Sequence, residues 1–279
     1  MRKRAFIFGS GYVASFLSQR LREIGYIVYC TSRDKPHDKF TVSFYNQDYL
    51  ETLLATADVI LSTVGTDDNV VDPVLHRYRN SIYLSRAKWI GYLSSTGVYG
   101  DHDGKWVNEY SACNTNSKKG KLRLKAEKYW LSIQHNIHIL RLSGIYGPMR
   151  NCLEEILKGR QHTIIKQGHN FSRVHIEDIC QFIISSISNP RDGTIYNVSD
   201  CTPAPLHEVH NFATKILLRK NLEAVPLEKA NISIRKMSFF QENRQVCNRR
   251  AMKLRNGNWT YLSYKEGLLQ GCLPYLSNI

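Results

Sequence analysis

Residues 5–14 read Ala-Phe-Ile-Phe-Gly-Ser-Gly-Tyr-Val-Ala, and this stretch decides the fold. Its first four residues are apolar and aromatic or branched, which is typical of a strand buried on both faces of a sheet. Gly9, Gly11 and Ala14 then give the spacing Gly-x-Gly-x-x-Ala. The first glycine permits a tight turn, the second admits a pyrophosphate close to the backbone, and the small third residue lets helix and strand approach each other. The stretch predicts a strand, turn and helix that bind a dinucleotide.

An amphipathic helix follows the turn and is closed by Gly25. Its apolar face is predicted to contain Val13, Phe16, Leu17, Leu21 and Ile24. The start of such a helix offers free N–H groups and a positive dipole to a diphosphate. The residues expected to contact the cofactor here are Gly9, Ser10, Gly11, Tyr12 and Val13. The alternative is an ordinary glycine-rich turn between a strand and a helix.

A second strand, 26–30, ends in Thr31-Ser32-Arg33-Asp34 and bears on the choice of cofactor. Proteins that bind NAD usually place an acid about 20 residues after the glycines, whereas those that bind NADP offer a cation. The strand tip has no acid, so Arg33 is predicted to hold a 2′-phosphate, and the Thr31 and Ser32 hydroxyls could add hydrogen bonds. We expect NADP, with NAD as the alternative in which Arg33 pairs with Asp34 or with water.

The composition is that of a globular and strongly basic protein. The chain has 279 residues, is 42% hydrophobic and carries a formal charge of +14 with a pI near 9.5. Its seven cysteines show no Cys-x-x-Cys pair and no regular spacing, which favours reduced thiols and a cytoplasmic location. No apolar stretch approaches the length of a membrane span, so we expect no membrane partner. The charge predicts anionic partners, among them the cofactor phosphates, an anionic substrate or nucleic acid.

Two segments hold much of the basic charge. The first contains Lys118, Lys119, Lys121, Arg123, Lys125 and Lys128, and the second contains Arg244, Arg249, Arg250, Lys253 and Arg255. Apolar residues recur at helical spacing within the first segment, so a solvated helix face is the expected explanation and a binding surface is the alternative. Because nothing in the chain resembles a defined nucleic-acid-binding module, a nucleic-acid partner is not expected.

Strand and helix patterns alternate through most of the chain. This alternation predicts an α/β fold with a doubly wound parallel sheet. The strand 58–64 ends in small residues, and Thr63, Val64 and Gly65 are expected to contact the cofactor at the carboxyl edge of the sheet. Further strands are predicted at 40–44, 89–95, 137–142 and 194–198, with helices at 49–57, 177–187 and around 206–217. We expect a dinucleotide-binding core over 1–200 and a small substrate-side lobe over 201–279.

Three motifs then appear in order after the glycine turn. They are Leu93-Ser94-Ser95-Thr96-Gly97-Val98-Tyr99-Gly100, Leu140-Arg141-Leu142-Ser143-Gly144-Ile145-Tyr146-Gly147-Pro148 and Ser172-Arg173-Val174-His175-Ile176-Glu177-Asp178-Ile179. Together they resemble the extended, epimerase/dehydratase-like form of the short-chain dehydrogenase/reductase superfamily, over nearly the whole chain. Residues 100–109 and 264–268 look most like its atypical YeeZ-like branch. The resemblance implies a nicotinamide cofactor, redox chemistry on a carbonyl or hydroxyl carbon, and pairing of two copies through helices that flank the sheet.

The resemblance also identifies what is missing. Active members have a Tyr-x-x-x-Lys pair, in which the lysine lowers the tyrosine pKa so that the phenol exchanges a proton with the substrate. Here Lys119 stands at the tyrosine position and Arg123 at the lysine position. Arginine stays protonated and cannot exchange a proton at neutral pH. The expected catalytic residues are therefore Ser95 and Thr96 to orient the substrate oxygen, and Lys119 or Tyr99 as the acid, although Tyr99 could instead have a structural or substrate-contact role.

Other polar residues have weaker patterns. His207 and His210 lack the spacing of a metalloprotease helix, so no metal is expected. Asp178 is expected to cap a helix, while Arg141 and Arg173 could meet an anionic substrate or pair with a carboxylate. Two main hypotheses follow: an NADP-preferring oxidoreductase or epimerase acting on a sugar-like or nucleotide-linked substrate, or a cofactor-binding sensor or scaffold without turnover. A nucleic-acid-associated protein is the third.

Overall fold

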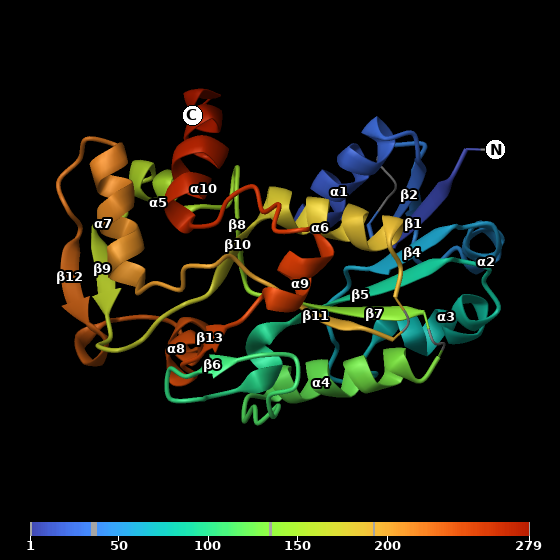
Figure 1. The fold of residues 1–279 in the computed structure, drawn as a ribbon, viewed down its shortest axis with the longest axis horizontal. Helices are drawn as coiled ribbons and strands as arrows, with labels where there is room; N and C mark the ends of the chain where they lie inside the picture. Colours follow the sequence, from blue (N-terminus) through green and yellow to red (C-terminus); the bar gives the residue numbers. More distant parts are fainter. Residues whose placement is uncertain (1, 35–37, 134–135, 192, 279) are drawn as a thin grey trace. The chain divides into compact units, whose positions relative to one another are not determined.

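The structure is a computed structural model that describes residues 2–34, 38–133, 136–191 and 193–278 (Figure 1). The chain divides into two compact units that interleave along the sequence. The first unit comprises Met1–Val98, Lys118–Arg141 and Ile179–Tyr196, and the second comprises Tyr99–Ser117, Leu142–Asp178 and Asn197–Ile279. The expected division into a core over 1–200 and a lobe over 201–279 stays a prediction.

A seven-stranded sheet forms the centre of the first unit, and its order is β11-β7-β5-β4-β1-β2-β3. The strands are β1 (Arg4–Phe8), β2 (Ile27–Ser32), β3 (Thr41–Ser43), β4 (Val59–Ser62), β5 (Trp89–Ser95), β7 (Ile137–Leu142) and β11 (Ile195–Val198). Strand β1 pairs in parallel with β2 and β4, so the chain reverses its direction of travel across the sheet at β1. The predicted α/β fold with a doubly wound parallel sheet is confirmed.

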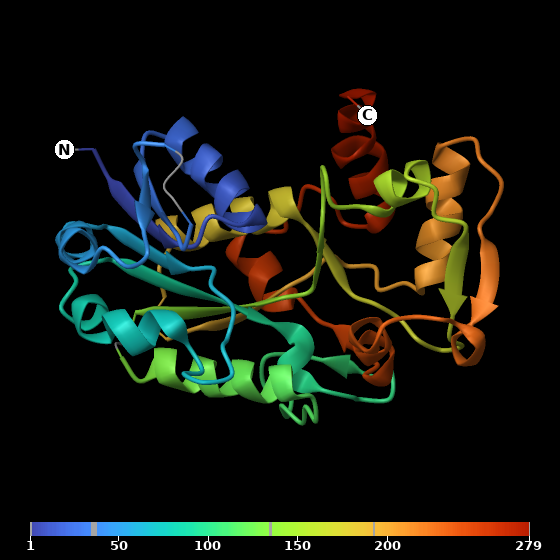
Figure 2. The same ribbon diagram turned by 180° about the vertical axis from the view of Figure 1, so that it is seen from behind.

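Helices cover both faces of this sheet. One face carries α1 (Tyr12–Glu23) and α6 (Ile176–Ser188), and the other carries α2 (Gln47–Ala55), α3 (Pro73–Tyr83) and α4 (Lys118–Leu131) (Figure 2). The second face buries a large apolar cluster that includes Phe8, Leu54, Tyr78, Ile90 and Trp130. This layering explains why the strands read as continuous apolar runs.

Two local details differ from expectation. Helix α3 was not predicted, although Asp72 caps it by accepting hydrogen bonds from the N–H groups of Val74 and Leu75, and Pro73 begins it. Such an Asp-Pro start is a known helix signal. Ile24, expected on the buried face of α1, is 56% exposed because the helix ends at Glu23.

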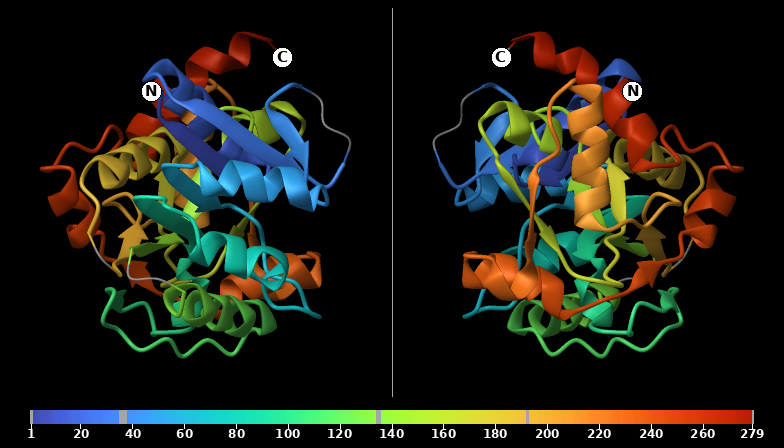
Figure 3. Two further views of the ribbon diagram at one scale, coloured as in Figure 1. Left: turned by 90° about the vertical axis from the view of Figure 1, so that its right-hand side faces the viewer. Right: turned by 90° about the vertical axis from the view of Figure 1, so that its left-hand side faces the viewer.

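The second unit contains three short parallel strand pairs: β8 (Gly144–Tyr146) with β10 (Arg173–His175), β9 (His162–Ile165) with β12 (Glu223–Pro226), and β6 (Trp106–Val107) with β13 (Gln245–Val246). Its helices are α5 (Cys152–Leu157), α7 (Leu206–Ile216), α8 (Ile234–Gln241), α9 (Arg249–Leu254) and α10 (Tyr264–Gly271). Short 3-10 helices are η1 (Thr96–Tyr99), η2 (Leu227–Lys229) and η3 (Leu273–Asn278). Helix α7 lies beside β9 (Figure 3), and α5, α7 and α10 share one apolar cluster.

The expectations about the cysteines and about membrane-spanning segments can be compared with the described residues. The seven cysteines are all free thiols, as expected from their spacing. Among the helices of the described ranges, none combines the length and the apolar character that a membrane span requires.

Candidate functional site

A glycine turn joins β1 to α1. Gly9 has a φ of +103°, a conformation that favours glycine, and its N–H donates to Thr31 Oγ1 at 2.9 Å. A Cβ atom at Gly9 would lie 2.5 Å from Thr63 Oγ1. The turn is therefore closed onto the ends of β2 and β4, and only glycine fits its first position.

Gly11, in contrast, faces open space at the start of α1. No heavy atom lies within 4 Å of the place where its Cβ would be. Gly11 has no side chain to cap the helix, and the first turn of α1 contains no acidic residue. The N–H groups and the positive dipole at this end suit an anion such as a phosphate. Ala14 is fully buried, which lets α1 approach the sheet closely.

The tip of β2 contains the residues expected to select the cofactor. The Thr31 side chain is 2% exposed and its hydroxyl is used by the Gly9 N–H, so Thr31 supports the turn. Ser32 Oγ accepts a hydrogen bond from Asp34 N at 3.2 Å, and Arg33 is exposed. A single sequence does not reveal the role of Thr31, because it depends on the pairing of β1 with β2.

At the tip of β4, one residue bonds to the neighbouring strand β1 and another leaves the sheet edge exposed. Thr63 donates to the carbonyl oxygen of Phe8 through its N–H and through its hydroxyl, each at 2.9 Å. Val64 packs against the apolar core, whereas Gly65 is exposed and has no heavy atom near its Cβ position. Of the three residues predicted here, Thr63 fastens the sheet edge and Gly65 leaves it accessible.

A buried charge network lies behind the end of β5. The Ser94 hydroxyl donates to Glu127 Oε1 at 2.5 Å, and Arg141 contacts the same carboxylate with an Nη2–Oε2 distance of 2.7 Å. The Arg141 and Glu127 side chains are only 4% and 2% exposed. This network joins β5, α4 and β7 inside the first unit. The sequence left open whether Arg141 meets an anionic substrate or pairs with a carboxylate, and the structure shows that it pairs with Glu127.

Ser95 and Thr96, which are expected to orient the substrate oxygen, come directly after Ser94 in the chain. Ser95 is half-buried, and its Oγ accepts a hydrogen bond from Gly97 N at 3.1 Å. Thr96 is 7% exposed and begins η1. As an acceptor from Gly97, the Ser95 hydroxyl keeps its own proton available for donation to a substrate oxygen.

Arg123, at the position of the relay lysine, is held on β5. Its Nη1 donates to Tyr92 Oη at 2.9 Å and to the Leu93 carbonyl oxygen at 3.0 Å. Burial raises the pKa of Tyr92, so this phenol stays neutral. Lys119, four residues earlier on α4, is exposed. Arg123 thus fastens α4 to the strand and cannot take part in a proton relay.

Tyr99, the other candidate acid, is fully buried in the second unit. Its hydroxyl donates to Asn197 Oδ1 at 2.7 Å, and Asn197 Nδ2 in turn donates to the Cys247 carbonyl oxygen at 3.1 Å. These contacts favour the structural role that the sequence left open for Tyr99. Its use as an acid stays a prediction without support from the geometry.

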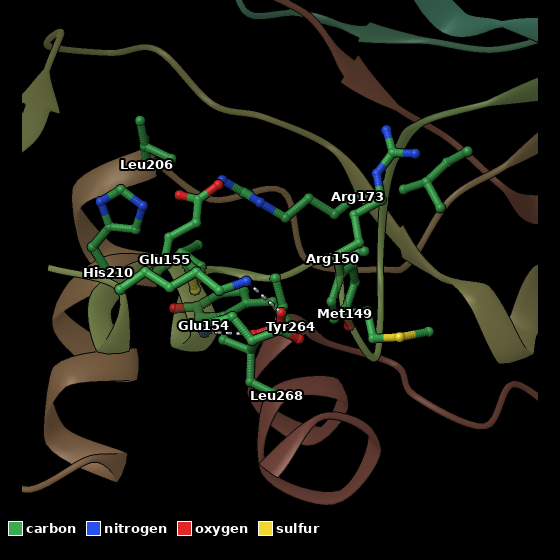
Figure 4. Close-up of a pocket in the computed structure, with 15 residues that line it drawn as sticks. Met149, Arg150, Glu154, Glu155, Arg173, Leu206, His210, Tyr264 and Leu268 are labelled. Carbon is green, nitrogen blue, oxygen red and sulfur yellow. Dashed lines mark hydrogen bonds and ion pairs between the residues drawn. The ribbon is translucent and has the colours of Figure 1, made fainter. Parts of the chain in front are cut away.

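The second unit contains a cavity of about 420 Å³ that the sequence did not indicate. It is enclosed by the segment 145–158, by Arg173 and by helices α7 and α10. Figure 4 shows His210, Glu155 and Arg173 along one side and Leu268 on the opposite side. Cations, carboxylates and an aromatic side chain, Tyr264, thus line one space, which suits a polar ligand with both donors and acceptors.

Buried acids brace the same unit. Asp178 accepts hydrogen bonds from the backbone N–H of Thr260 at 2.6 Å and of Tyr261 at 3.0 Å, and its Oδ1 lies 3.2 Å from Arg255 Nη1. The expectation that Asp178 caps its own helix is thus wrong, because its carboxylate holds a distant loop. Burial raises the pKa of Asp200 to about 8, and the nearby Arg173 opposes that shift.

A cysteine and a histidine meet in the second unit without forming a nucleophile. Cys272 Sγ lies 3.9 Å from His175 Nε2, and both side chains are buried. Burial raises the pKa of the Cys272 thiol and lowers the pKa of His175 to about 4. Both groups are therefore neutral at neutral pH, unlike a reactive thiolate. Within the described part of the chain, no group of three or more His, Cys, Asp or Glu residues is placed to hold a metal ion.

Known proteins share this fold and part of this sequence. The chain is 31% identical to Protein YeeZ of Escherichia coli strain K12 over 169 residues, which are 57% of this chain and 58% of YeeZ. It therefore spans less than two thirds of that curated relative. No family model matches the chain.

Two solved structures extend the likeness over almost the full length. A functionally unknown conserved protein from Silicibacter pomeroyi has 33% sequence identity and a TM-score of 0.88, with 95% of this chain and 96% of that chain covered. The human epimerase family protein SDR39U1, solved with NADPH, has 16% identity and a TM-score of 0.75 over 95% of this chain and 97% of its own. Together with the glycine turn and the parallel sheet, these similarities show that the chain is related in sequence to YeeZ over part of its length and to the Silicibacter pomeroyi protein over almost all of it, and that it shares its fold with an epimerase family protein.

Proposed function

We propose that this chain binds a nicotinamide dinucleotide at the β1–α1 turn and acts as an oxidoreductase or epimerase/dehydratase on a sugar-like or nucleotide-linked substrate. The start of α1 is the main support, because Gly11 leaves open space beside a helix end that no side chain caps. A diphosphate requires both features. The structural likeness to a protein solved with NADPH agrees with this proposal.

NADP is the preferred cofactor in this proposal. Arg33 is exposed at the tip of β2, and an arginine side chain binds a phosphate through two parallel hydrogen bonds. Ser32 is the second proposed ligand of the 2′-phosphate. Thr31 is left out because it is only 2% exposed and supports the glycine turn. Gly65 and Val64 are proposed to contact the cofactor through their backbone at the edge of the sheet.

The bound nicotinamide would supply the hydride donor or acceptor, while the protein positions the substrate. Ser95 is proposed to donate a hydrogen bond to the reacting oxygen and so to orient it, with Thr96 beside it. Lys119 is proposed as the group that exchanges a proton, because Arg123 is held by Tyr92 and Leu93.

A second function is favoured by the same contacts of Arg123. Since arginine stays protonated and Tyr99 is buried against Asn197, the chain offers no Tyr-x-x-x-Lys relay. It could then bind NADP without turnover and act as a sensor or scaffold. The two proposals agree on the cofactor and differ only in whether hydride transfer occurs.

Two measurements separate these proposals. Titration with NADPH and NADH, followed by intrinsic fluorescence, should show tighter binding of NADPH, and tighter binding of NADH would contradict the role of Arg33. Hydride exchange is then measured with a panel of nucleotide sugars and aldehydes. Exchange that falls in Lys119→Gln but not in the exposed control Lys220→Gln supports the enzyme. Cofactor binding with no exchange for any compound supports the sensor.

A further inference from the structure

Three lysines form a row along one exposed face of α4. Lys121, Lys125 and Lys128 are four and three residues apart, a spacing that places side chains on the same face of a helix. All three side chains are exposed. We call these three residues the lysine row. Helix α4 lies on the same side of the sheet as α3 (Figure 2).

In the part of the chain that the structure describes, the lysine row has no ion-pair partner. The only acid of α4 is Glu127, which is buried and held by Arg141. Lys118 uses the neighbouring Asp68, at 2.6 Å, and among the described residues no carboxylate is within ion-pair distance of the row itself. Helix α3 adds no acid, and its Arg79 donates to Ser132 at 3.3 Å, just beyond the end of α4.

This arrangement opposes the stability of the helix. Like charges three and four residues apart repel one another, and the lysines at 118 and 119 face the positive end of the helix dipole. The first turn of α4 contains no acid to offset them. Asp68 offsets Lys118, but among the described residues no carboxylate offsets the repulsion within the lysine row. A local conflict of this kind is expected where a surface is used for function.

We propose that the lysine row binds the phosphate backbone of a single-stranded nucleic acid, independently of the proposed enzymatic function. Lys121 and Lys128 are seven positions apart, which is about 10 Å along the helix axis. One strand of a DNA duplex presents a phosphate about every 3.4 Å along the helix axis. A single strand is flexible enough to adjust its phosphates to a row of this length, so three lysines can meet phosphates of one strand.

The aromatic neighbour of the row favours a single strand. Tyr129 is 38% exposed, and Lys125 Nζ lies 5.6 Å from the centre of its ring. An exposed ring beside cations offers a stacking surface for an unpaired base. A membrane surface fits less well, because the apolar residues Ala126 and Trp130 are buried in the core and leave α4 with no apolar face to insert.

The same surface bears on self-association. Pairing two copies through α4 would bring one lysine row against another, and their repulsion would oppose that contact. The homodimer expected from the family resemblance would therefore need a different face or an anionic strand between the copies. This consequence does not depend on the cofactor.

The test uses the full chain and fluorescence anisotropy with a short unstructured oligoribonucleotide over a range of salt concentrations. The variant K121Q/K125Q/K128Q should lower the slope of log K against log salt by about 2, since each phosphate contact contributes about 0.7 for single strands. The control K215Q/K220Q/K229Q removes the same charge from exposed lysines of the second unit and should leave the slope nearly unchanged. A shared thermal unfolding midpoint shows that both variants fold.

Four results would overturn the proposal. They are no binding by the wild-type chain at low salt, equal loss in the row and control variants, binding to polyglutamate as tight as to RNA, and binding only to vesicles that contain phosphatidylserine. Tighter binding to double-stranded than to single-stranded nucleic acid would also overturn the choice of a single strand. A selective loss in the row variant, with Tyr129→Ala weakening RNA binding further than Tyr83→Ala, would support it.

Discussion

The β1–α1 turn and the β5–α4 segment belong to the same unit, and the sequence predicted functional residues in both, yet they are built in opposite ways. At the turn, Gly11 and Gly65 leave open space beside a helix end. In the β5–α4 segment, side chains close the space instead. Arg123 of α4 donates to Tyr92 of β5, and Glu127 of α4 accepts from Ser94 of β5 and from Arg141 of β7. The comparison teaches that the backbone features for a dinucleotide are present at the turn, while Arg123, at the lysine position of the relay, is bonded to β5 instead.

The physical reason lies in the type of group that each region uses. A turn binds phosphate through N–H groups and a dipole, which need only backbone geometry and missing side chains. A relay needs a side chain with a matched pKa that is free to reach the substrate. Arg123 has neither property, because it is protonated at neutral pH and is bound to Tyr92 and Leu93.

The largest effect is expected for Glu127→Gln, which tests whether the β5–α4 segment is structural. The change leaves the guanidinium of Arg141 buried without a counter-charge. We expect the free energy of unfolding to fall by about 3 to 5 kcal/mol, measured by urea denaturation. The double variant E127Q/R141M should recover much of this loss, because it removes the unpaired charge. A loss below about 1 kcal/mol would show that the pair is not a brace.

Gly9→Ala tests the closed part of the turn. Its φ of +103° and the 2.5 Å approach of a Cβ to Thr63 Oγ1 combine backbone strain with a clash. The free energy of unfolding should fall by about 2 to 4 kcal/mol. Gly25→Ala is the matched control, since Gly25 also has a positive φ, +92°, but faces open space, and should lose only about 1 kcal/mol. Equal losses would mean that the contact with Thr63 is unimportant.

Gly11→Ala tests the open part of the same turn. Because nothing lies near its Cβ position, the substitution should leave the unfolding midpoint almost unchanged. The added methyl group would occupy the approach of the diphosphate, and NADPH affinity should fall about tenfold, or 1.4 kcal/mol, by fluorescence titration. Unchanged affinity in a folded variant would remove the main support for the cofactor site.

Arg123→Lys should have the smallest effect, and it tests whether the β5–α4 segment is independent of the cofactor site at the β1–α1 turn. Lysine cannot contact Tyr92 and Leu93 in the same planar geometry, so the free energy of unfolding should fall by about 1 kcal/mol. NADPH affinity should not change, because Arg123 has no part in the turn. A selective loss of NADPH affinity would instead place Arg123 in the cofactor site.

Much of the fold could be read from the sequence, because its signals act locally. The apolar run 5–8, the glycines after it and the repeated alternation of strands and helices were enough for a doubly wound sheet. Helix α3 was missed because its apolar positions are interrupted by arginines and tyrosines, although Asp72 and Pro73 marked its start. The interleaving of the two units could not be foreseen, since it depends on which distant segments associate.

The sequence also identified candidate residues more reliably than it assigned their roles. Ser95, Arg33 and Gly11 occupy accessible or half-buried positions that fit a site. Thr31, Tyr99 and Asp178 instead bond to Gly9, to Asn197 and to the loop at Thr260. Those partners are far away along the chain, so no local pattern could reveal them.

The amino-acid sequence alone determined that a nucleotide-binding strand, turn and helix begin this protein, because glycine spacing and apolar periodicity act on the neighbouring backbone. Only the tertiary structure decided that Arg123 and Glu127 are braces, that no carboxylate of the described residues pairs with the lysine row, and that a cavity with charged and apolar lining forms in the second unit. Those properties depend on which side chains from distant parts of the chain come into contact and which stay exposed. Both are determined only when the chain has folded.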